Sequence, residues 1–351
     1  MEVNDLIRRD LMDSPAYHPS QPCGGVKLDT NESPWGLPDK IRQKLIHWLE
    51  DEENLNRYPD SDNTALKGAI AKFWDVRPEN VTCGVGSDQL IDVICKMFIE
   101  PGDAVVTQKP TFGMYAVSAV LNRGRAATAP VGYDVSAAEA IVNAAALEKA
   151  KIIFLCVPNN PTGRGMSEEG VRFVLENARS VVVIDEAYGE FSGRSSVSLI
   201  KKYPNMIVLR TFSKAFGLAG ARVGYALADG ALVKIIDTAK PPFNLPVISQ
   251  LLALWAMENA GEFTARAKQM AGARDRLYET LHKLDWLDVE LSESNFLYIR
   301  SERDVAAVLE RGGVSARNFG KSGNEYRVRV SIGSDEENKK VSDLLCGAYP
   351  K

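Results

Sequence analysis

The sequence is poor in the residues that most often build metal centres and histidine-based catalytic triads. Its 351 residues include three histidines, and its five cysteines are scattered without a C-x-x-C pair. Zinc sites and redox dithiols need closely spaced ligands, so this pattern predicts no metal site. The odd cysteine count indicates reduced thiols in a cytoplasmic protein and argues against a disulfide framework.

The chain also lacks long apolar runs and any excess of positive charge. No run of 18 or more apolar residues occurs, which predicts no membrane span, and residues 1–13 are too polar for a signal peptide. The 42 Lys and Arg residues against 46 Asp and Glu give a net charge of -4. That balance argues against a nucleic-acid or anionic-membrane partner.

What the chain does contain is an alternation of short apolar runs and amphipathic stretches. Continuous apolar strands separated by helices predict an α/β fold, with a mostly parallel central sheet covered by helices on both faces. The expected strands of this sheet span residues 81–84, 104–106, 152–155, 181–184, 206–209 and 223–227. The helices expected around it span residues 38–51, 64–74, 115–121 and 167–177.

The last third of the chain has a different pattern of apolar residues. Residues 246–284 have a long helical pattern, and a small α+β unit is expected after them. Its predicted elements are strands over 289–291, 296–299 and 326–332 and helices over 304–311 and 335–348. We therefore expect an N-terminal arm (1–28), a large domain (29–245) and a small C-terminal domain with an interdomain helix (246–351).

The candidate chemistry is centred on residues 211–225. Lys214 follows a predicted strand, at the carboxyl end where open α/β sheets bind ligands. Ser213 and Arg222 could hold a phosphate, and a lysine beside them could form an imine with a carbonyl group. Pyridoxal phosphate needs such a lysine and such a phosphate site. A single loop lysine is usually only solvated, so the prediction depends on further residues.

Asp185, Asn159 and Tyr188 could supply the other contacts of a pyridoxal ring. Asp185 directly follows the predicted strand 181–184 and could pair with a protonated ring nitrogen, although a helix cap or a salt bridge would explain it too. Asn159, in the P-N-N-P-T-G stretch, and Tyr188 could donate hydrogen bonds to the ring's phenolic oxygen. The same stretch also has the composition of a stiff turn.

Two further groups carry weaker signals. Ser87 and Asp88 open a predicted helix directly after a strand, where free backbone N–H groups bind anions, and helix capping explains them equally well. Phe112 and Tyr115 could offer a ring that stacks on the pyridine. An aromatic residue at such a position more often belongs to the core.

Together these residues identify a resemblance. The chain resembles the fold-type I pyridoxal-phosphate-dependent aminotransferases, and within them it looks most like the histidinol-phosphate branch. The resemblance covers nearly the whole chain in the expected order. Its motifs are Asn31-Glu32-Ser33-Pro34, Asn56-Arg57-Tyr58-Pro59, Pro158-Asn159-Asn160-Pro161-Thr162-Gly163, Asp185-Glu186-Ala187-Tyr188, Ser213-Lys214-Ala215-Phe216, Ala221-Arg222-Val223-Gly224-Tyr225 and Val328-Arg329-Val330.

The resemblance implies a role for each cofactor residue. Lys214 would carry the covalent bond to pyridoxal 5'-phosphate and later move the proton, while Asp185 would pair with the ring nitrogen. Asn159 and Tyr188 would bind the ring hydroxyl, and Phe112 would stack where the family often has tyrosine. The residues expected around the cofactor phosphate are Ser87, Asp88, Ser213 and Arg222, with Tyr58 reaching in from the neighbouring subunit of a homodimer.

The substrate residues follow from the same resemblance. Arg317 and Arg329 would bind the substrate's anionic end, with Asn31 nearby and Tyr17 closing over it. Arg329 is expected on the strand 326–332, and Arg317 on a loop after two glycines. Two guanidinium groups in one pocket suit a dianionic phosphate better than a single carboxylate does.

The leading hypothesis is an aminotransferase of histidine biosynthesis that uses L-histidinol phosphate and 2-oxoglutarate. An aromatic amino-acid aminotransferase and a threonine-phosphate decarboxylase share the scaffold and stay open as alternatives. A regulator with an aminotransferase-like ligand domain would need a winged-helix module before that domain. Residues 1–28 are too few for such a module, and the acidic charge also argues against it.

Overall fold

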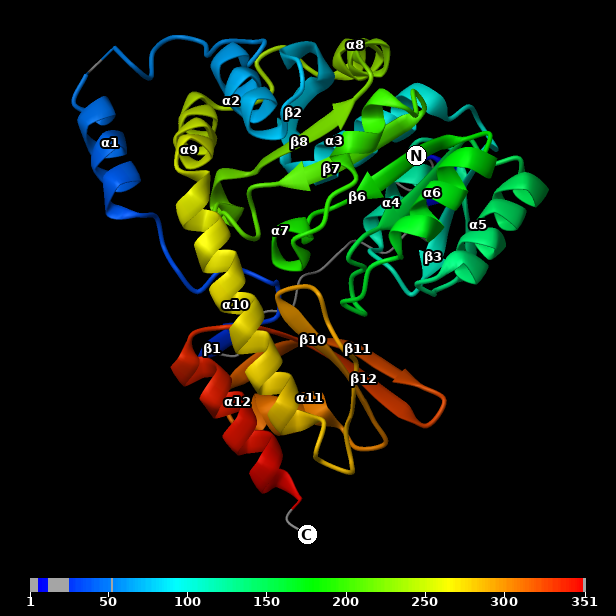
Figure 1. The fold of residues 1–351 in the computed structure, drawn as a ribbon, viewed down its shortest axis with the longest axis vertical. Helices are drawn as coiled ribbons and strands as arrows, with labels where there is room; N and C mark the ends of the chain where they lie inside the picture. Colours follow the sequence, from blue (N-terminus) through cyan, green and yellow to red (C-terminus); the bar gives the residue numbers. More distant parts are fainter. Residues whose placement is uncertain (1–5, 12–24, 52, 350–351) are drawn as a thin grey trace.

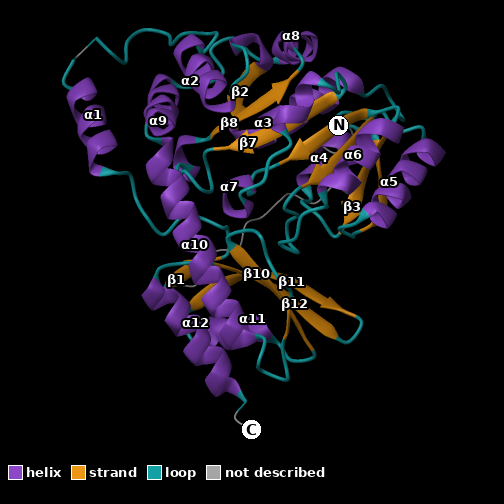
Figure 2. Ribbon diagram, viewed as in Figure 1, coloured by secondary structure: helices purple, strands orange, loops and turns teal. Residues whose placement is uncertain are grey.

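The computed structural model describes residues 6–11, 25–51 and 53–349. Within these residues the chain forms a larger body around a seven-stranded sheet and a smaller body around a five-stranded sheet (Figure 1). Helices flank both sheets (Figure 2). The predicted fold class, a mostly parallel sheet between helices with a smaller α+β unit, is confirmed.

The larger sheet brings the ends of its strands to one edge. Its order is β2-β8-β7-β6-β5-β3-β4, and all neighbouring pairs are parallel except those of β8. Because β8 is antiparallel, its amino end lies where the other strands have their carboxyl ends. The strands are β2 (Val81–Val85), β3 (Ala104–Lys109), β4 (Arg125–Pro130), β5 (Ile152–Cys156), β6 (Val181–Asp185), β7 (Met206–Thr211) and β8 (Val223–Ala228).

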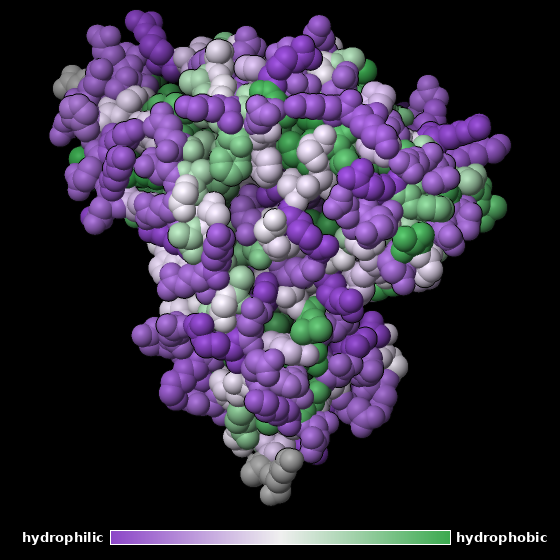
Figure 3. All heavy atoms as spheres, in the orientation of Figure 1, coloured by the Kyte–Doolittle hydropathy of each residue, from purple (hydrophilic) through white to green (hydrophobic). Residues whose placement is uncertain are grey.

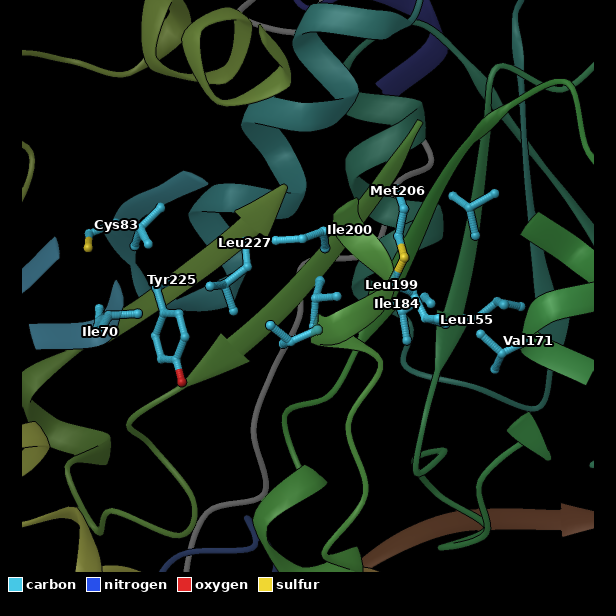
Figure 4. Packing of buried hydrophobic residues seen from close by; sticks show 14 of the residues in the cluster. Ile70, Cys83, Leu155, Val171, Ile184, Leu199, Ile200, Met206, Tyr225 and Leu227 are labelled. Carbon is cyan, nitrogen blue, oxygen red and sulfur yellow. The ribbon is translucent and has the colours of Figure 1, made fainter. Parts of the chain in front are cut away.

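Both faces of this sheet are buried, which explains the continuous apolar runs in its strands. Successive side chains alternate between two cores: Leu155 and Ile184 pack in one, and Phe154 and Val183 in the other. Figure 4 shows the first core, with Leu155, Ile184 and Leu227 in one layer. Helices α1 (Asp39–Leu49), α2 (Thr64–Trp74), α5 (Val135–Glu148), α6 (Glu168–Asn177) and α9 (Val247–Glu258) contribute to it, and α3 (Gly86–Phe98), α4 (Met114–Leu121) and α8 (Gly230–Ala239) to the second core.

The smaller body packs three helices against the second sheet. This sheet has the order β1-β11-β12-β10-β9, and the long helix α10 runs into it from the larger body (Figure 1). Its strands are β1 (Val26–Leu28), β9 (Asp288–Val289), β10 (Phe296–Ser301), β11 (Val314–Ser322) and β12 (Glu325–Ser331). Its helices are α10 (Ala260–Leu281), α11 (Val305–Arg311) and α12 (Asp335–Ala348).

Some elements differ from the sequence-based expectation. Strand β1, at the end of the predicted arm, pairs in parallel with β11 and so joins the second sheet. Strand β11 itself was not expected, and the single helical stretch over 246–284 is two helices that meet at Asn259. Neither β4 nor α5 was foreseen as an individual element.

The surface carries few clues to a partner on the face drawn in Figure 3, where hydrophilic side chains predominate and hydrophobic ones lie in separate patches.

One exposed aromatic residue stands out. Tyr58 is 82% exposed, and its ring stacks on that of the half-exposed Phe243 with a centroid distance of 4.6 Å. Among the described residues, no helix is both long and apolar enough to cross a membrane.

Candidate active site

A cavity of about 760 Å³ lies at the edge of the larger sheet and is closed on one side by the smaller body. Asp185 ends β6, Lys214 follows β7, and Arg222 precedes β8, so three neighbouring strands deliver these side chains to one place. Arg317 and Arg329 reach the same cavity from β11 and β12 of the smaller sheet. The sequence-based prediction of a site at this edge therefore agrees with the geometry.

Lys214 projects its amine into this cavity. Its Nζ donates a hydrogen bond to the backbone oxygen of Thr30 at 2.8 Å and lies 6.0 Å from the ring centroid of Tyr188. Burial lowers the pKa of Lys214 to about 8, and the positive charge of Arg329 adds to this effect against the opposing charge of Glu32. A lysine with such a pKa has a substantial neutral fraction near pH 8 and can act as a nucleophile.

Asp185 is a buried carboxylate, and the two groups that donate hydrogen bonds to it are both neutral. Its Oδ2 accepts from the hydroxyl of Tyr115 at 2.7 Å, and its Oδ1 accepts from the backbone N–H of Ala187 at 3.0 Å. Burial raises the pKa of Asp185 to about 6, although both hydrogen bonds act in the opposite direction. A cationic group placed in the cavity beside this carboxylate would relieve the cost of keeping it ionised.

Tyr188 has a hydroxyl that accepts two amide hydrogens. Asn31 Nδ2 donates to it at 3.0 Å and Asn160 Nδ2 at 3.3 Å. The hydroxyl's own hydrogen therefore stays available for a donor bond into the cavity. Burial raises the pKa of Tyr188 to about 12, so the phenol is protonated at neutral pH.

The arrangement of the two asparagines corrects a sequence-based assignment. Asn159 was expected to face the cofactor, but its Nδ2 donates to the backbone oxygen of Pro110 and to Thr162 Oγ1, which holds the turn together. Its Oδ1 accepts from Thr111 Oγ1. Asn160 is the one that lines the cavity. The sequence offers two adjacent asparagines, and only the backbone path of the turn decides which of them points inward.

The two arginines of the smaller sheet lie directly opposite each other. Arg317 and Arg329 are register partners across β11 and β12, so the expected loop position of Arg317 is wrong. Arg329 is 7% exposed and donates to Asn160 Oδ1 at 2.5 Å and to the backbone oxygen of Asp29 at 2.7 Å. Both guanidinium groups line the cavity, as an anionic substrate group would require.

Comparison with known proteins decides the family. The aminotransferase class I and II family matches residues 24–345, and a histidinol-phosphate aminotransferase of Ruminiclostridium cellulolyticum is 37% identical over 350 residues, 98% of each chain. The chain belongs to the class I and II aminotransferases. The enzyme of the same name from Caldanaerobacter subterraneus subsp. tengcongensis is 34% identical over 347 residues, again 98% of each chain.

Solved structures agree on the fold of this aminotransferase. The histidinol-phosphate aminotransferase of Sinorhizobium meliloti, in complex with pyridoxal-5'-phosphate, superposes with a TM-score of 0.86 at 24% identity and covers 97% of this chain and 96% of its own. A threonine-phosphate decarboxylase of Porphyromonas gingivalis has a TM-score of 0.80 at 22% identity and covers 91% of this chain and 98% of its own. The likeness to both shows the shared fold. As a member of this family the protein is a pyridoxal-phosphate-dependent enzyme that transfers amino groups.

The cavity fits the phosphate of that cofactor. Arg222 Nη2 pairs with Asp88 Oδ2 at 3.0 Å, and its Nη1 lies 3.4 Å from Ser213 Oγ. Ser87 lines the cavity at the first turn of α3, where backbone N–H groups favour an anion. Gly86 has φ +70°, and a Cβ on it would lie 2.7 Å from Arg222 Nη2, so glycine permits the close approach of the guanidinium.

The ring of the cofactor also finds partners of the right chemistry. A protonated pyridine nitrogen would suit Asp185, and the ring oxygen would suit the free hydrogen of Tyr188. Phe112 lines the cavity and packs edge-on against Tyr115 with a centroid distance of 5.5 Å. Asn31 lines it too, but its Oδ1 accepts from Ser331 Oγ and its Nδ2 serves Tyr188, so it orients that tyrosine.

Several predicted and unpredicted residues complete the comparison with the sequence. Tyr58 is not among the residues that line the cavity, and Tyr17 lies outside the described residues. The sequence alone did not assign Asn160 or the bond from Tyr115 to Asp185. In the sequence, Asn160 is the second asparagine of its motif and Tyr115 is an aromatic residue near Phe112. Their contacts depend on the folded backbone.

Proposed function

We propose that this aminotransferase converts L-histidinol phosphate and 2-oxoglutarate into imidazole-acetol phosphate and L-glutamate, a step of histidine biosynthesis. The observation that carries the proposal is the pair Arg317 and Arg329, which are register partners on the adjacent strands β11 and β12 and line the cavity that also contains Lys214. Two guanidinium groups match a phosphate dianion. The full-length similarity to enzymes named histidinol-phosphate aminotransferase supports the same substrate.

Different residues of the cavity would hold different parts of the cofactor. Lys214 would bind it covalently, Asp185 would hold the proton on the ring nitrogen, and Tyr188 would donate to the ring oxygen. Phe112 would stack on the ring. Ser87, Asp88, Ser213 and Arg222 would surround the phosphate. When bound, pyridoxal phosphate supplies the electron sink that stabilises the carbanion formed at the substrate's amino-bearing carbon.

Lys214 has a second role in the proposal, because proton transfer needs a base beside that carbon. Its Nζ would take the proton from the substrate's amino-bearing carbon and deliver it to the cofactor side within the same half-reaction, and with 2-oxoglutarate it would carry out the reverse transfer. A pKa of about 8 favours both directions, since a general base works best when its pKa is near the working pH.

The arginine pair gives the first test. We expect Arg317→Ala to lower kcat/KM for histidinol phosphate about 10- to 100-fold, the usual loss of a charge-assisted hydrogen bond, and to change kcat/KM for phenylalanine less. Steady-state kinetics with both donors measure the ratio. Arg329→Ala should impair both donors, because Arg329 also positions Asn160.

A neighbouring arginine provides the matched control. Arg327 lies on β12, the strand of Arg329, and pairs with Glu325 at 3.7 Å, but it does not line the cavity. Arg327→Ala should leave the donor ratio unchanged. A wild-type preference for phenylalanine, or a ratio that Arg317→Ala does not alter, would favour an aromatic amino-acid aminotransferase. Carbon dioxide released from threonine phosphate would favour the decarboxylase.

We also propose a homodimer with shared active sites. Tyr58 is 82% exposed and stacks on the 42% exposed Phe243, so this aromatic pair lies at the surface. Leu55, in the same loop, is 60% exposed. A second copy covering this surface would bury these apolar groups and carry Tyr58 towards the cofactor phosphate of the partner.

Mixed dimers test whether Tyr58 acts across the interface. Tyr58→Phe should weaken cofactor binding about 10- to 100-fold, as one hydrogen bond to a charged group is lost. Two differently tagged chains, one with Tyr58→Phe and one with Lys214→Ala, can be combined and purified as a mixed dimer. If Tyr58 acts in trans, one site carries both defects and the other carries neither, so half of the wild-type activity should return at limiting cofactor. Activity no higher than half that of the Tyr58→Phe homodimer would place Tyr58 in its own subunit's site.

The division of the chain and its location remain proposals as well. We propose an arm (1–28), a large cofactor-binding domain (29–245) and a small domain with the interdomain helix (246–351), with β1 as the part of the arm that pairs into the second sheet. We also propose that the enzyme acts in the cytoplasm, since its scattered cysteines indicate a reducing compartment.

A further inference from the structure

Tyr115 connects two residues of the cavity while contacting no solvent. It lies on α4, is 0% exposed, and its hydroxyl donates to Asp185 Oδ2 at 2.7 Å. Its ring stacks on Phe154 with a centroid distance of 4.7 Å, and Phe112 packs edge-on against it at 5.5 Å. One buried side chain therefore contacts both the carboxylate expected at the ring nitrogen and the aromatic ring expected to stack on the cofactor.

The surroundings of Asp185 make this contact consequential. Burial acts against its ionised form, and the negative charges of Asp88 and Glu186 act in the same direction. The neighbouring Cys156 and Tyr188 are neutral at working pH, since burial raises the pKa of each to about 12. Only the N–H of Ala187 and the hydroxyl of Tyr115 are seen to donate to the carboxylate among the described residues. Tyr115 is the one of the two that a substitution can remove.

We propose that Tyr115 is a positioning residue for amino transfer: its hydroxyl keeps the Asp185 carboxylate ionised and fixed in orientation, so that the proton stays on the cofactor's ring nitrogen. The inference rests on the proposed function of the cavity. Without this donor the carboxylate becomes more basic and takes up the proton itself. The ring nitrogen is then neutral, and the cofactor loses much of its ability to withdraw electrons.

A buried tyrosine outside the cavity offers a direct comparison. Tyr225 on β8 is also 0% exposed, and its hydroxyl accepts a hydrogen bond from Trp74 Nε1 at 3.0 Å. It does not line the cavity. Tyr225→Phe removes the same chemical group from a similar environment, so it measures what the loss of a buried phenol does to the fold.

The decisive measurement is the protonation of the ring nitrogen. Each variant is reconstituted with pyridoxal phosphate labelled with ¹⁵N, and the ¹⁵N chemical shift is recorded. Wild type and Tyr225→Phe should show a protonated nitrogen, and Tyr115→Phe should shift towards the neutral pyridine value. In the same variant kcat should fall about 10- to 100-fold with little change in KM, the size expected when a bond to an ionised group is lost. An unchanged shift in Tyr115→Phe would overturn the proposal.

A double-mutant cycle separates positioning from a structural role. If Tyr115 acts through Asp185, adding Tyr115→Phe to Asp185→Asn should lower kcat no further. A further loss comparable to that in the wild-type background would overturn the proposal. Should Tyr115→Phe alone fail to fold, the comparison of Asp185→Asn with the double variant still decides, because in that background the lost hydroxyl leaves a neutral amide unpaired and not a buried charge.

The two proposals can fail separately. An enzyme that binds pyridoxal phosphate with a protonated ring nitrogen but does not use histidinol phosphate would refute the substrate assignment. The response of the ¹⁵N shift to Tyr115→Phe would still test the role of Tyr115, since that measurement requires only the bound cofactor.

Discussion

Replacing Lys214 with methionine is expected to lower kcat about 10⁴-fold or more, the upper end of what a positioned general acid–base group contributes. The variant loses both the covalent attachment of the cofactor and the base beside the substrate carbon. Methionine retains the apolar stem, so the wall of the cavity should persist. Steady-state transamination measures the loss, and purified wild type should be yellow while the variant should not hold the cofactor covalently.

Chemical trapping identifies the lysine directly. Borohydride reduction of the wild-type enzyme should fix the cofactor to the single peptide that contains Lys214, and a label on another lysine would contradict the assignment. Lys240 provides the control, because it is another largely buried lysine, and its Nζ pairs with Asp237 at 2.7 Å outside the cavity. Lys240→Met should still be labelled at Lys214.

The pKa of Lys214 allows a second test of its buried position, in the cofactor-free protein. Its folded-state pKa of about 8 lies below the ordinary value of 10.5 that applies to the unfolded chain. Protonation therefore costs stability: the cost is fully present below pH 8 and is lost as pH rises towards 10.5. Lys214→Met should raise the melting temperature of the cofactor-free protein at pH 7, and the difference should shrink by pH 10. A difference that does not depend on pH would mean that the amine is not desolvated.

Local patterns in the sequence were enough to predict six of the seven strands of the larger sheet, all except β4. Strands β5, β6 and β7 are buried on both faces, so each is a continuous apolar run that stands out from its flanks. Residues at the ends of those strands, such as Asp185 and Lys214, follow from the strand positions alone. The parallel arrangement then brings them to one edge.

The smaller sheet and the finer contacts of the site depend on tertiary structure. Strand β11 is mostly exposed over its second half and reads V-S-A-R-N-F-G-K-S, with little apolar alternation, so its pairing with β12 is what makes it a strand. That pairing moves Arg317 from an expected loop to a position opposite Arg329. The bond between Tyr115 and Asp185 spans 70 residues and depends on how α4 lies on the sheet.

Asp185→Asn is expected to lower kcat about 10²- to 10³-fold or more while the cofactor stays bound. That range is typical when one preorganised electrostatic contact to the reacting group is removed. Asparagine can fit the site, since its oxygen can accept from Ala187 N and its amide can donate to the Tyr115 oxygen. It carries no charge, however, so it cannot hold a proton on the ring nitrogen. Kinetics and cofactor content measured together separate loss of chemistry from loss of binding.

The cofactor-free form of the same variant tests the cause of that loss. Burial raises the folded-state pKa of Asp185 to about 6, above its ordinary value of 3.8, so ionisation of the buried carboxylate costs stability fully above pH 6. The cost is lost as pH falls from 6 towards 3.8. Asp185→Asn should therefore melt at a higher temperature than wild type at pH 7 and show a smaller difference at pH 4. Asp92→Asn, which alters a carboxylate bonded to Asn122 outside the cavity, should not show the kinetic loss. Near-normal turnover in Asp185→Asn would mean that the carboxylate serves the fold, and the role given to the ring nitrogen would have to be abandoned.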